Sequence, residues 1–579
     1  MRALFVALAT LGAWTASGAE PLAVDLSDGW MFKRGDDPGW SADGFDDSGW
    51  ERIKVGREWE EQGHADYDGF GWYRKRFVVP AALREEEGVG VEGLLLELGR
   101  IDDVDETWFN GRRVGGRGGL PPAYDPAWGA ERKYRIEKSL VRWGDENEIA
   151  VRVYDGKAQG GMLGRTFQLR APMLSDLVSL EPEWGDGDGV FGGTETAALR
   201  VSLRNSSSRD VKGRLTWTVA DDEGERLGSE ERGVSIGARS SVTLAQRIRA
   251  EAPGFFKVRC VFEPEGDEAE LVLERLVGKS YESIRSPLTR EDDFEAFWEE
   301  TLRALARVEP EFQMERQAGR DSETHEVFEV GMRSLGGVRV RGWYERPKRA
   351  GGDRVPALLR VPGYSSSMWP TGDGAKMAYF SFNIRGHGNS QDDVPGEPAN
   401  YWIRGLDDHQ GYFYQGAYAD CVRAVDFLVS REEIDPERIA VTGGSQGGGL
   451  SLATAALDPR IAACAPDIPF LCDWVKYFKA SSWPEIDEWI AAKPVRTWET
   501  TLRTMSYFDA LNLAERVRCP VLLSLGVQDA VCPASTIFSV YNRLAGEREF
   551  RAYAEVGHSV PAEHRALRRA WLMGKLGVE

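Results

Sequence analysis

Residues 438–457 read RIAVTGGSQGGGLSLATAAL: an apolar run, then a serine flanked by glycines, then a run rich in alanine and leucine. The chain holds 65 glycines among 579 residues, so a chance G-x-S-x-G match has odds of roughly one in three and needs structural context. Here a predicted buried strand ends before Ser445 and a predicted helix begins after it. This order is typical of a nucleophile elbow, in which Gly443 and Gly447 permit a tight strand-to-helix turn.

Outward from this stretch, apolar strands and amphipathic helices alternate from residue 280 to residue 579. A helix is predicted within 286–308, where Thr289 is the candidate N-cap. The further predicted strands are 357–361, 379–384, 438–443, 461–467, 521–526 and 550–558, and the further predicted helices are 417–430, 449–457 and 562–576. Alternation of this kind indicates a parallel sheet covered by helices, so residues 280–579 are predicted to form an α/β-hydrolase domain.

A serine hydroxyl is a weak nucleophile until a base accepts its proton. Of the six histidines, only His558 follows a late predicted strand and precedes the last helix. Asp529 ends the strand-like run VLLSLGVQD between the two. The order Ser445, Asp529, His558 is that of α/β-hydrolases, so we expect nucleophile, acid and base in these positions.

The negative oxygen that forms when a serine attacks an ester needs two N–H donors. One is expected from the backbone of Gln446, directly after the nucleophile. The other is expected from the loop after an early strand, where LLRVPGYSSS offers the backbone of Tyr364.

Two β-rich segments precede this domain. Residues 20–172 carry alternating apolar residues, Asn-Gly and Gly-Gly turns and many tryptophans, which predicts an antiparallel sandwich. The segment resembles the galactose-binding-like jelly roll of family 2 glycoside hydrolases through Asp46-Asp47-Ser48-x-Trp50, Trp72-Tyr73-Arg74, Asn110-Gly111 and the strand 147–154. Because large aromatics are buried by default, Trp40, Trp50 and Trp59 are expected to serve the structure.

Residues 173–279 show short alternating strands with polar turns, the pattern of an immunoglobulin-like β-sandwich. We find no chemistry in this segment and expect a spacer. The predicted fold class is therefore multidomain: two N-terminal β-sandwiches followed by an α/β-hydrolase domain.

Residues 1–19 resemble a signal peptide, with Arg2, an apolar run over 4–14, and the small residues Ser17 and Ala19 before a cleavage point. The alternative is a membrane anchor, but the run is shorter than the about 20 residues that a span needs. We expect a secreted or periplasmic protein. The spacing of the six cysteines matches no zinc site. One or two disulfides are possible, but the sequence assigns no pairing.

The formal charge of −21 and the isoelectric point near 5.0 argue against nucleic acid, whose phosphates require a basic face, and against anionic membranes. Neither class is expected as a partner.

Residues 286–577 resemble the acetyl xylan esterase and cephalosporin C deacetylase family, carbohydrate esterase family seven. The motifs are DFEAFWEETL, Pro362-Gly363-Tyr364, Arg385-Gly386-His387-Gly388, YADCVRAVDFL, GGSQGG at 443–448, Gly526-x-x-Asp529-x-x-Cys532-Pro533 and Gly557-His558. The resemblance implies removal of acetyl groups from xylo-oligosaccharides without metal or cofactor, and Arg385 and Gly386 as structural support. The family usually has His, Gln and Glu where Pro362, His387 and Ser559 stand here. The aromatic side chains of one loop are expected to line the sugar side of the site: Trp402, Tyr412, Phe413 and Tyr414.

The main hypothesis is a deacetylase that acts on an acetylated carbohydrate, with a homo-oligomer left open. Ring-shaped hexamers are typical of the family, and two added β domains would hinder them. The alternatives are another α/β-hydrolase, such as a prolyl-oligopeptidase-like peptidase, and a non-catalytic carbohydrate-binding protein. The first would normally carry repeated propeller blades, which the sequence lacks; the second would normally have lost one of the three reactive residues.

Overall fold

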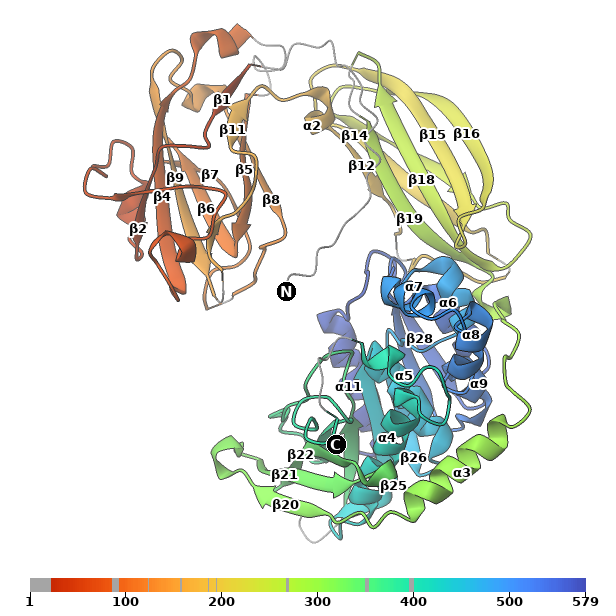
Figure 1. The fold of residues 1–579 in the computed structure, drawn as a ribbon. Coiled ribbons are helices and arrows are strands. Elements are labelled where there is room, and N and C mark those ends of the chain that lie inside the picture. The colour runs from red at the N-terminus through yellow and green to blue at the C-terminus, as the bar shows by residue number, and fades with distance from the viewer. Residues whose placement is uncertain are drawn as a thin grey trace.

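The structure is a computed structural model that describes residues 22–85, 93–122, 124–156, 159–185, 187–193, 195–266, 270–348, 354–394 and 400–578. The predicted signal peptide, residues 1–19, lies outside the described residues. Figure 1 shows two β-sandwiches followed by a domain of strands and helices, which confirms the multidomain fold class. Over the described residues, every helix is too short or too polar to cross a bilayer.

The first sandwich is built from two antiparallel sheets. One has the strand order β3-β2-β4-β9-β6-β7, and the other has β1-β11-β5-β10 with β8 also paired to β5. The strands are β1 (Ala23–Asp25), β2 (Trp30–Arg34), β3 (Glu51–Ile53), β4 (Gly69–Val78), β5 (Leu94–Asp102), β6 (Val104–Phe109), β7 (Arg112–Arg117), β8 (Glu131–Ile136), β9 (Glu146–Asp155), β10 (Gly161–Met162) and β11 (Gln168–Arg170). Their inward faces form one apolar core between the sheets.

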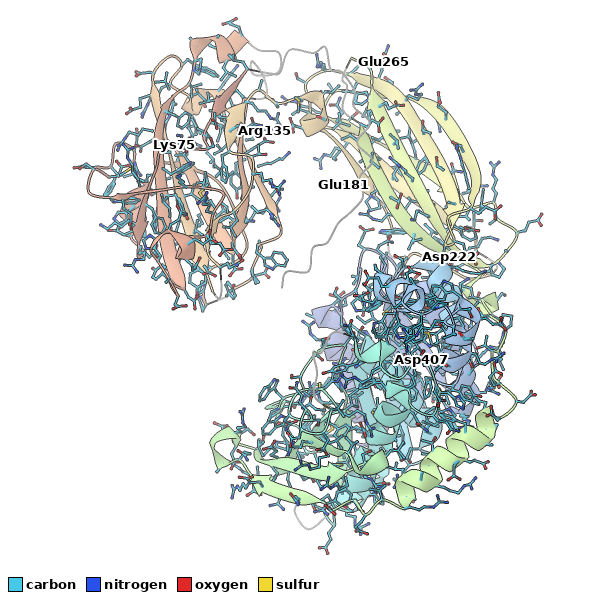
Figure 2. All side chains as sticks on the ribbon, viewed as in Figure 1. Lys75, Arg135, Glu181, Asp222, Glu265 and Asp407 are labelled. Carbon is cyan, nitrogen blue, oxygen red and sulfur yellow. The ribbon has the colours of Figure 1, made fainter. Side chains whose placement is uncertain are left out.

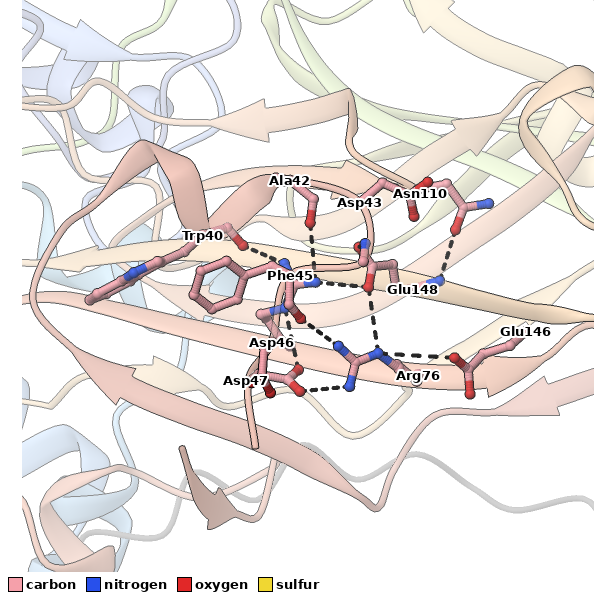
Figure 3. A network of polar contacts seen from close by, with 12 residues as sticks. Trp40, Ala42, Asp43, Phe45, Asp46, Asp47, Arg76, Asn110, Glu146 and Glu148 are labelled. Carbon is pink, nitrogen blue, oxygen red and sulfur yellow. Dashed lines mark hydrogen bonds and ion pairs between the residues drawn. The ribbon is translucent and has the colours of Figure 1, made fainter. Parts of the chain in front are cut away.

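A polar network holds the loop 36–47 of this sandwich to its sheet (Figure 3). The carboxylate of Asp47 accepts from Arg76 Nη1 at 2.6 Å and from Arg74 Nε at 3.3 Å. The buried Arg74 also pairs with Glu148 at 2.8 Å. Asp47, the second aspartate of the Asp-Asp-Ser-x-Trp motif, therefore has a structural role.

The three tryptophans expected to serve the structure are packed into this sandwich. Trp59 is fully buried, and Trp50 is 8% exposed. Trp40 packs edge-on against Trp50 and Trp72, at centroid distances of 5.2 and 6.0 Å.

The second sandwich follows the short helix α2 (Leu174–Leu177) and has its own core. Its sheets have the orders β12-β14-β17 and β13-β19-β18-β15-β16. The strands are β12 (Val178–Pro182), β13 (Val190–Phe191), β14 (Ala198–Asn205), β15 (Val211–Asp221), β16 (Arg226–Ile236), β17 (Ser240–Arg247), β18 (Gly254–Pro264) and β19 (Leu271–Lys279).

The third domain contains a sheet of order β20-β21-β22-β24-β23-β25-β26-β27-β28. Its strands are β20 (Gln313–Arg316), β21 (His325–Arg333), β22 (Arg339–Pro347), β23 (Val355–Arg360), β24 (Ala378–Asn383), β25 (Ile434–Gly444), β26 (Ile461–Asp467), β27 (Val521–Gly526) and β28 (Arg548–Tyr553). The strands from β23 to β28 pair in parallel, as predicted. The strands β20, β21 and β22 instead form an antiparallel extension, so the sheet is mixed rather than wholly parallel.

The helices of this domain are α3 (Phe294–Ala306), α4 (Phe413–Val429), α5 (Gln446–Leu457), α6 (Trp474–Ala480), α7 (Pro484–Ala491), α8 (Trp498–Ser506), α9 (Ala510–Leu513), α10 (Ala534–Tyr541) and α11 (Ala562–Leu576). The predicted N-cap Thr289 is wrong: α3 begins after Asp293. Thr289 instead bonds the side chain of Asn512 through its N–H and hydroxyl, at 3.0 and 2.9 Å, so it fastens the segment before the helix.

All six cysteines lie within the described residues, and each is a free thiol. Five are buried and Cys519 is partly buried, which agrees with a packing role.

Candidate active site

Ser445 lies at the sharp turn between β25 and α5. Its backbone has φ 55° and ψ −119°, a region that non-glycine residues rarely adopt. The Ser445 N–H donates to Asp467 O at 3.0 Å, and the Ser445 carbonyl accepts from Phe470 N at 2.9 Å. The turn is therefore held from the neighbouring strand, and its hydroxyl is lifted above the carboxyl edge of the sheet.

The glycines around the serine are required by space. A Cβ on Gly443 would stand 2.6 Å from Gly447 O, and a Cβ on Gly447 would stand 2.6 Å from Val361 O. Both neighbours are backbone atoms, which cannot move aside at small cost. The close approach of β25, α5 and the loop after β23 thus depends on these two glycines.

The three side chains expected to react together form a hydrogen-bonded row. His558 Nε2 lies 3.0 Å from Ser445 Oγ, and His558 Nδ1 lies 2.8 Å from Asp529 Oδ2. Asp529 comes from the loop after β27 and His558 from the loop after β28. Ser445 and the imidazole are partly exposed to solvent, whereas the carboxylate is buried.

The second oxygen of Asp529 fixes the carboxylate. Asp529 Oδ1 accepts from the N–H groups of Val531 and Cys532, both at 2.8 Å. The free oxygen then faces His558 Nδ1, which assigns the proton of the neutral imidazole to Nδ1 and leaves Nε2 as the acceptor for the serine proton. The arrangement can serve general-base activation of Ser445.

A thiol also borders this row. The donor atoms of Asp529, Cys532 and His558 lie within 4.8 Å of one another, the one such group of three in the part of the chain that the structure describes. Burial raises the pKa of the Cys532 thiol well above its usual value, so it stays protonated. With the Asp529 oxygens already bonded to two N–H groups and to His558, the set is arranged for proton transfer rather than for metal binding.

The two expected N–H donors stand on adjoining segments. Gln446 is the first residue of α5, so its N–H has no acceptor within the helix. Tyr364 follows the segment 361–363. This segment is held against β25 by a hydrogen bond from Val361 N to Thr442 O, at 3.0 Å. The Tyr364 hydroxyl accepts from Asn400 N at 2.9 Å, which holds the loop from its far side.

The side chain of Gln446 is anchored by residues that the sequence did not reveal as its partners. Tyr414 OH donates to Gln446 Oε1 at 2.8 Å, and Gln446 Nε2 donates to His387 Nε2 at 3.1 Å. Burial lowers the pKa of His387 to about 4, so its imidazole is neutral. The histidine at the position where the family usually has glutamine thus bonds the residue after Ser445.

Arg385 and Gly386 both make contacts that hold the chain in place. The guanidinium of Arg385 makes a bidentate pair with the buried Asp420 at 2.8 and 2.9 Å and also donates to Leu335 O at 3.0 Å. Gly386 has φ 78°, and a Cβ there would stand 3.0 Å from the Tyr401 ring. Both residues fasten the loop that carries His387.

One interpretation is wrong. Aromatic residues of the loop 402–414 were expected to line the sugar side of the site. Trp402, Tyr412, Phe413 and Tyr414 are instead buried, with at most 5% exposed, and pack beneath the site. Trp483, which is half-buried at the start of α7, contacts Tyr364 and Trp402 at centroid distances of 5.8 and 4.7 Å and lies nearer the surface.

The C-terminal half of the chain is similar to known esterases. The family model described as acetyl xylan esterase (AXE1) matches residues 269–574. The acetyl esterase Axe7A of Xylanibacter ruminicola is 29% identical over 313 residues, which are 51% of this chain and 70% of that protein. A solved acetyl xylan esterase from Paenibacillus sp. R4 is 33% identical, with a TM-score of 0.47, and is matched over 51% of this chain and 98% of its own.

The β-rich N-terminal region has relatives of another kind. A putative β-glucuronidase of Formosa agariphila is 29% identical over 186 residues, which are 30% of this chain and only 16% of that protein. The N-terminal region is similar to the jelly rolls of glucuronidases.

Proposed function

The chain belongs to the acetyl xylan esterase family, and on that premise we propose that it is a serine carbohydrate esterase that removes O-acetyl groups from xylan-type or related saccharides through an acyl-enzyme. The observation that carries the proposal is the row of Ser445 Oγ, His558 Nε2 and Asp529 Oδ2, with contacts of 3.0 and 2.8 Å at a partly exposed elbow.

In the first half of the reaction, Ser445 Oγ attacks the acetyl carbonyl carbon while His558 Nε2 takes the hydroxyl proton. The imidazolium that results is stabilised by Asp529. The backbone N–H groups of Tyr364 and Gln446 receive the negative oxygen; such donors are worth about 100- to 1,000-fold each in rate. When the C–O bond to the sugar breaks, His558 returns the proton to the leaving sugar oxygen.

In the second half, water attacks the acetyl-serine ester and gives its proton to His558 Nε2. Collapse of the second tetrahedral intermediate returns the proton from His558 to Ser445 Oγ and releases acetic acid, which ionises to acetate in water. The cycle consumes one water and restores the free enzyme.

The substrate class, the location and the absence of a cofactor belong to the same proposal. The name of Axe7A, an acetyl esterase, supports an acetyl ester as the substrate. The leader-like residues 1–19 support export to the periplasm or the medium, where acetylated polysaccharides are met. The proposal requires no metal, nucleic acid or membrane.

Ser445→Ala tests the mechanism. We expect the variant to lose about 10⁴-fold or more of kcat on a chromogenic acetate and on acetylated xylo-oligosaccharides, because the nucleophile is gone while the site stays intact. The matched control is Ser365→Ala, a hydroxyl in the loop beside Tyr364, which should stay within about tenfold. Undiminished acetate release by Ser445→Ala would refute the serine mechanism.

The two alternative functions are separated by the products. The same preparations are assayed for acetate release and for cleavage of a peptide amide. Faster amide cleavage would favour the peptidase, and sugar binding without release of either product would favour a non-catalytic binding protein.

A further inference from the structure

The loops that carry Asp529 and His558 both contact the second sandwich. Strand β19 runs from that sandwich toward the third domain (Figure 1). Its residue Leu276 contacts the loop after β27, and Arg275 contacts the loop after β28. The sequence predicted a spacer without chemistry, whereas the Leu276 contact lies one residue from the expected acid.

Gln528, which directly precedes Asp529, makes the central contact. Its Oε1 accepts from Leu276 N at 2.9 Å, and its Nε2 donates to Leu276 O at 3.2 Å. The same Nε2 donates to Ala554 O at 2.7 Å. One half-buried carboxamide thus joins an edge of β19 to the segments that hold the acid and the histidine.

The backbone continues this link. Gln528 N donates to Val556 O at 3.0 Å, and Val527 N donates to Tyr553 O at 3.0 Å. The two loops are therefore fastened to each other directly beside the row of Ser445, His558 and Asp529, and the carboxamide of Gln528 ties both of them to the second sandwich.

Further contacts keep the sandwich in place around Gln528. Glu555 pairs with Arg275 at 2.8 Å and also accepts from Trp184 Nε1. Phe255 of β18 stacks on Phe538 of α10 at a centroid distance of 5.9 Å. The surface that meets the two loops is thus a packed seam and not a flexible tether.

We propose that Gln528 is a positioning residue that uses the main chain of Leu276 as a fixed support and so holds Asp529 and His558 in line with Ser445. The inference rests on the proposed serine mechanism, in which both contacts of His558 must be made at once. A displacement of about 1 Å in such a row can cost up to about 100-fold in rate.

The test compares Gln528→Met with the wild-type chain. Methionine keeps the length of the side chain but forms none of the three hydrogen bonds. The matched control is Lys479→Ala, which removes an ion pair of 3.2 Å with Glu223 elsewhere on the same seam; Figure 2 marks the neighbouring Asp222. kcat, KM and the pH profile of kcat/KM are measured on a chromogenic acetate, with the melting temperature.

We expect Gln528→Met to lower kcat about tenfold or more while KM changes less than about twofold. The acid limb of the pH profile should move to lower pH, because a displaced Asp529 stabilises the imidazolium of His558 less. Lys479→Ala should stay within about twofold in kcat and keep the profile.

A wild-type kcat and acid limb in Gln528→Met would overturn the proposal. A lower kcat with an unchanged acid limb would also overturn it, since that result indicates general loosening rather than displacement of the acid. Failure of the serine mechanism is distinguishable, because it shows in Ser445→Ala whatever Gln528→Met does.

Discussion

The two ends of the row formed by Ser445, His558 and Asp529 are supported in different ways. At the serine end, the support is local: Gly443, Gly447 and the Asp467 carbonyl belong to β25, α5 and the adjacent β26. At the acid–histidine end, the support comes from β19, through a hydrogen bond between residues 252 positions apart. A short motif can therefore specify a strained turn by itself, whereas the position of these two loops depends on contacts with a neighbouring domain.

At the acid–histidine end, replacing Asp529 itself should reduce activity most. Asp529→Asn should lower kcat by about 10⁴-fold with little change in KM, because an amide favours the wrong imidazole tautomer and leaves the imidazolium unsupported. Steady-state kinetics on a chromogenic acetate measure it. The control is Asp407→Asn, a surface acid marked in Figure 2 that pairs with Arg496 at 2.7 Å. A loss below about tenfold would mean that the acid–histidine end matters less than its support suggests.

The next effect concerns the serine end. Gly447→Ala should lower kcat/KM by about 100-fold or more, since the added Cβ would force apart Val361 O and the start of α5. Gly444→Ala is the control for the melting temperature, because its Cβ would meet only Asp467 Cβ, at 4.0 Å. Equal melting temperatures and equal activities in both variants would contradict the claim that the elbow is made by local packing.

The pH dependence of stability reports on His387, the histidine that bonds Gln446 beneath the strand-to-helix turn. The neutral His387, with its pKa lowered to about 4 by burial, takes up no proton when the unfolded chain does, below the usual pKa of about 6.5. Stability is therefore lost as the pH falls from about 6.5 toward 4.

His387→Gln should remove that loss. Between pH 7 and about pH 4.5, we expect the free energy of unfolding of the wild-type chain to fall by about 2 kcal/mol more than that of the variant. Urea unfolding at several pH values measures the difference. Parallel pH curves for the two chains would show that His387 is not held neutral at the serine end.

The smallest effect concerns the rim of the seam. Arg275→Ala removes the partly exposed pair with Glu555 and should cost at most about 1 kcal/mol of stability, with kcat within about threefold. The cost should shrink at about 1 M salt, where exposed charges are screened. Urea unfolding at low and high salt tests this. A loss of kcat as large as that of Gln528→Met would show that the ion pair between Arg275 and Glu555, and not the carboxamide of Gln528 alone, holds the loops in place.

Features set by neighbouring residues were predictable from the sequence. The run VLLSLG became β27 and the last helix became α11, residue for residue. The first is a short apolar run and the second an amphipathic segment, and both are bounded by turn residues. The three residues of the row were found through the strand-to-helix context of Ser445 and the order of acid and histidine along the chain. Helix α3 began after its predicted cap because Thr289 is used by Asn512 instead.

Features made by contacts between distant segments were not predictable. The carboxamide of Gln528 bonds main-chain groups that any residue except proline would supply at position 276, so no side-chain pattern marks the pair. In the sequence, the buried Trp402 and Tyr414 cannot be distinguished from surface aromatics that stack on sugars. Only the tertiary packing shows that they are buried. Tyr414 and His387 become partners of Gln446 only when three segments meet.

The apolar side of the seam bears on how the polypeptide can be divided. Val190 and Phe255 of the second sandwich, with Ile284 of the connecting segment, belong to the same buried cluster as the interior of the third domain. The junction near residue 280, where the pattern of the sequence changes, is therefore not a thermodynamic boundary. A fragment that begins there would expose Phe538 and its apolar neighbours to water. The second sandwich and the third domain should therefore unfold as one cooperative unit and be exchanged together among related polypeptides.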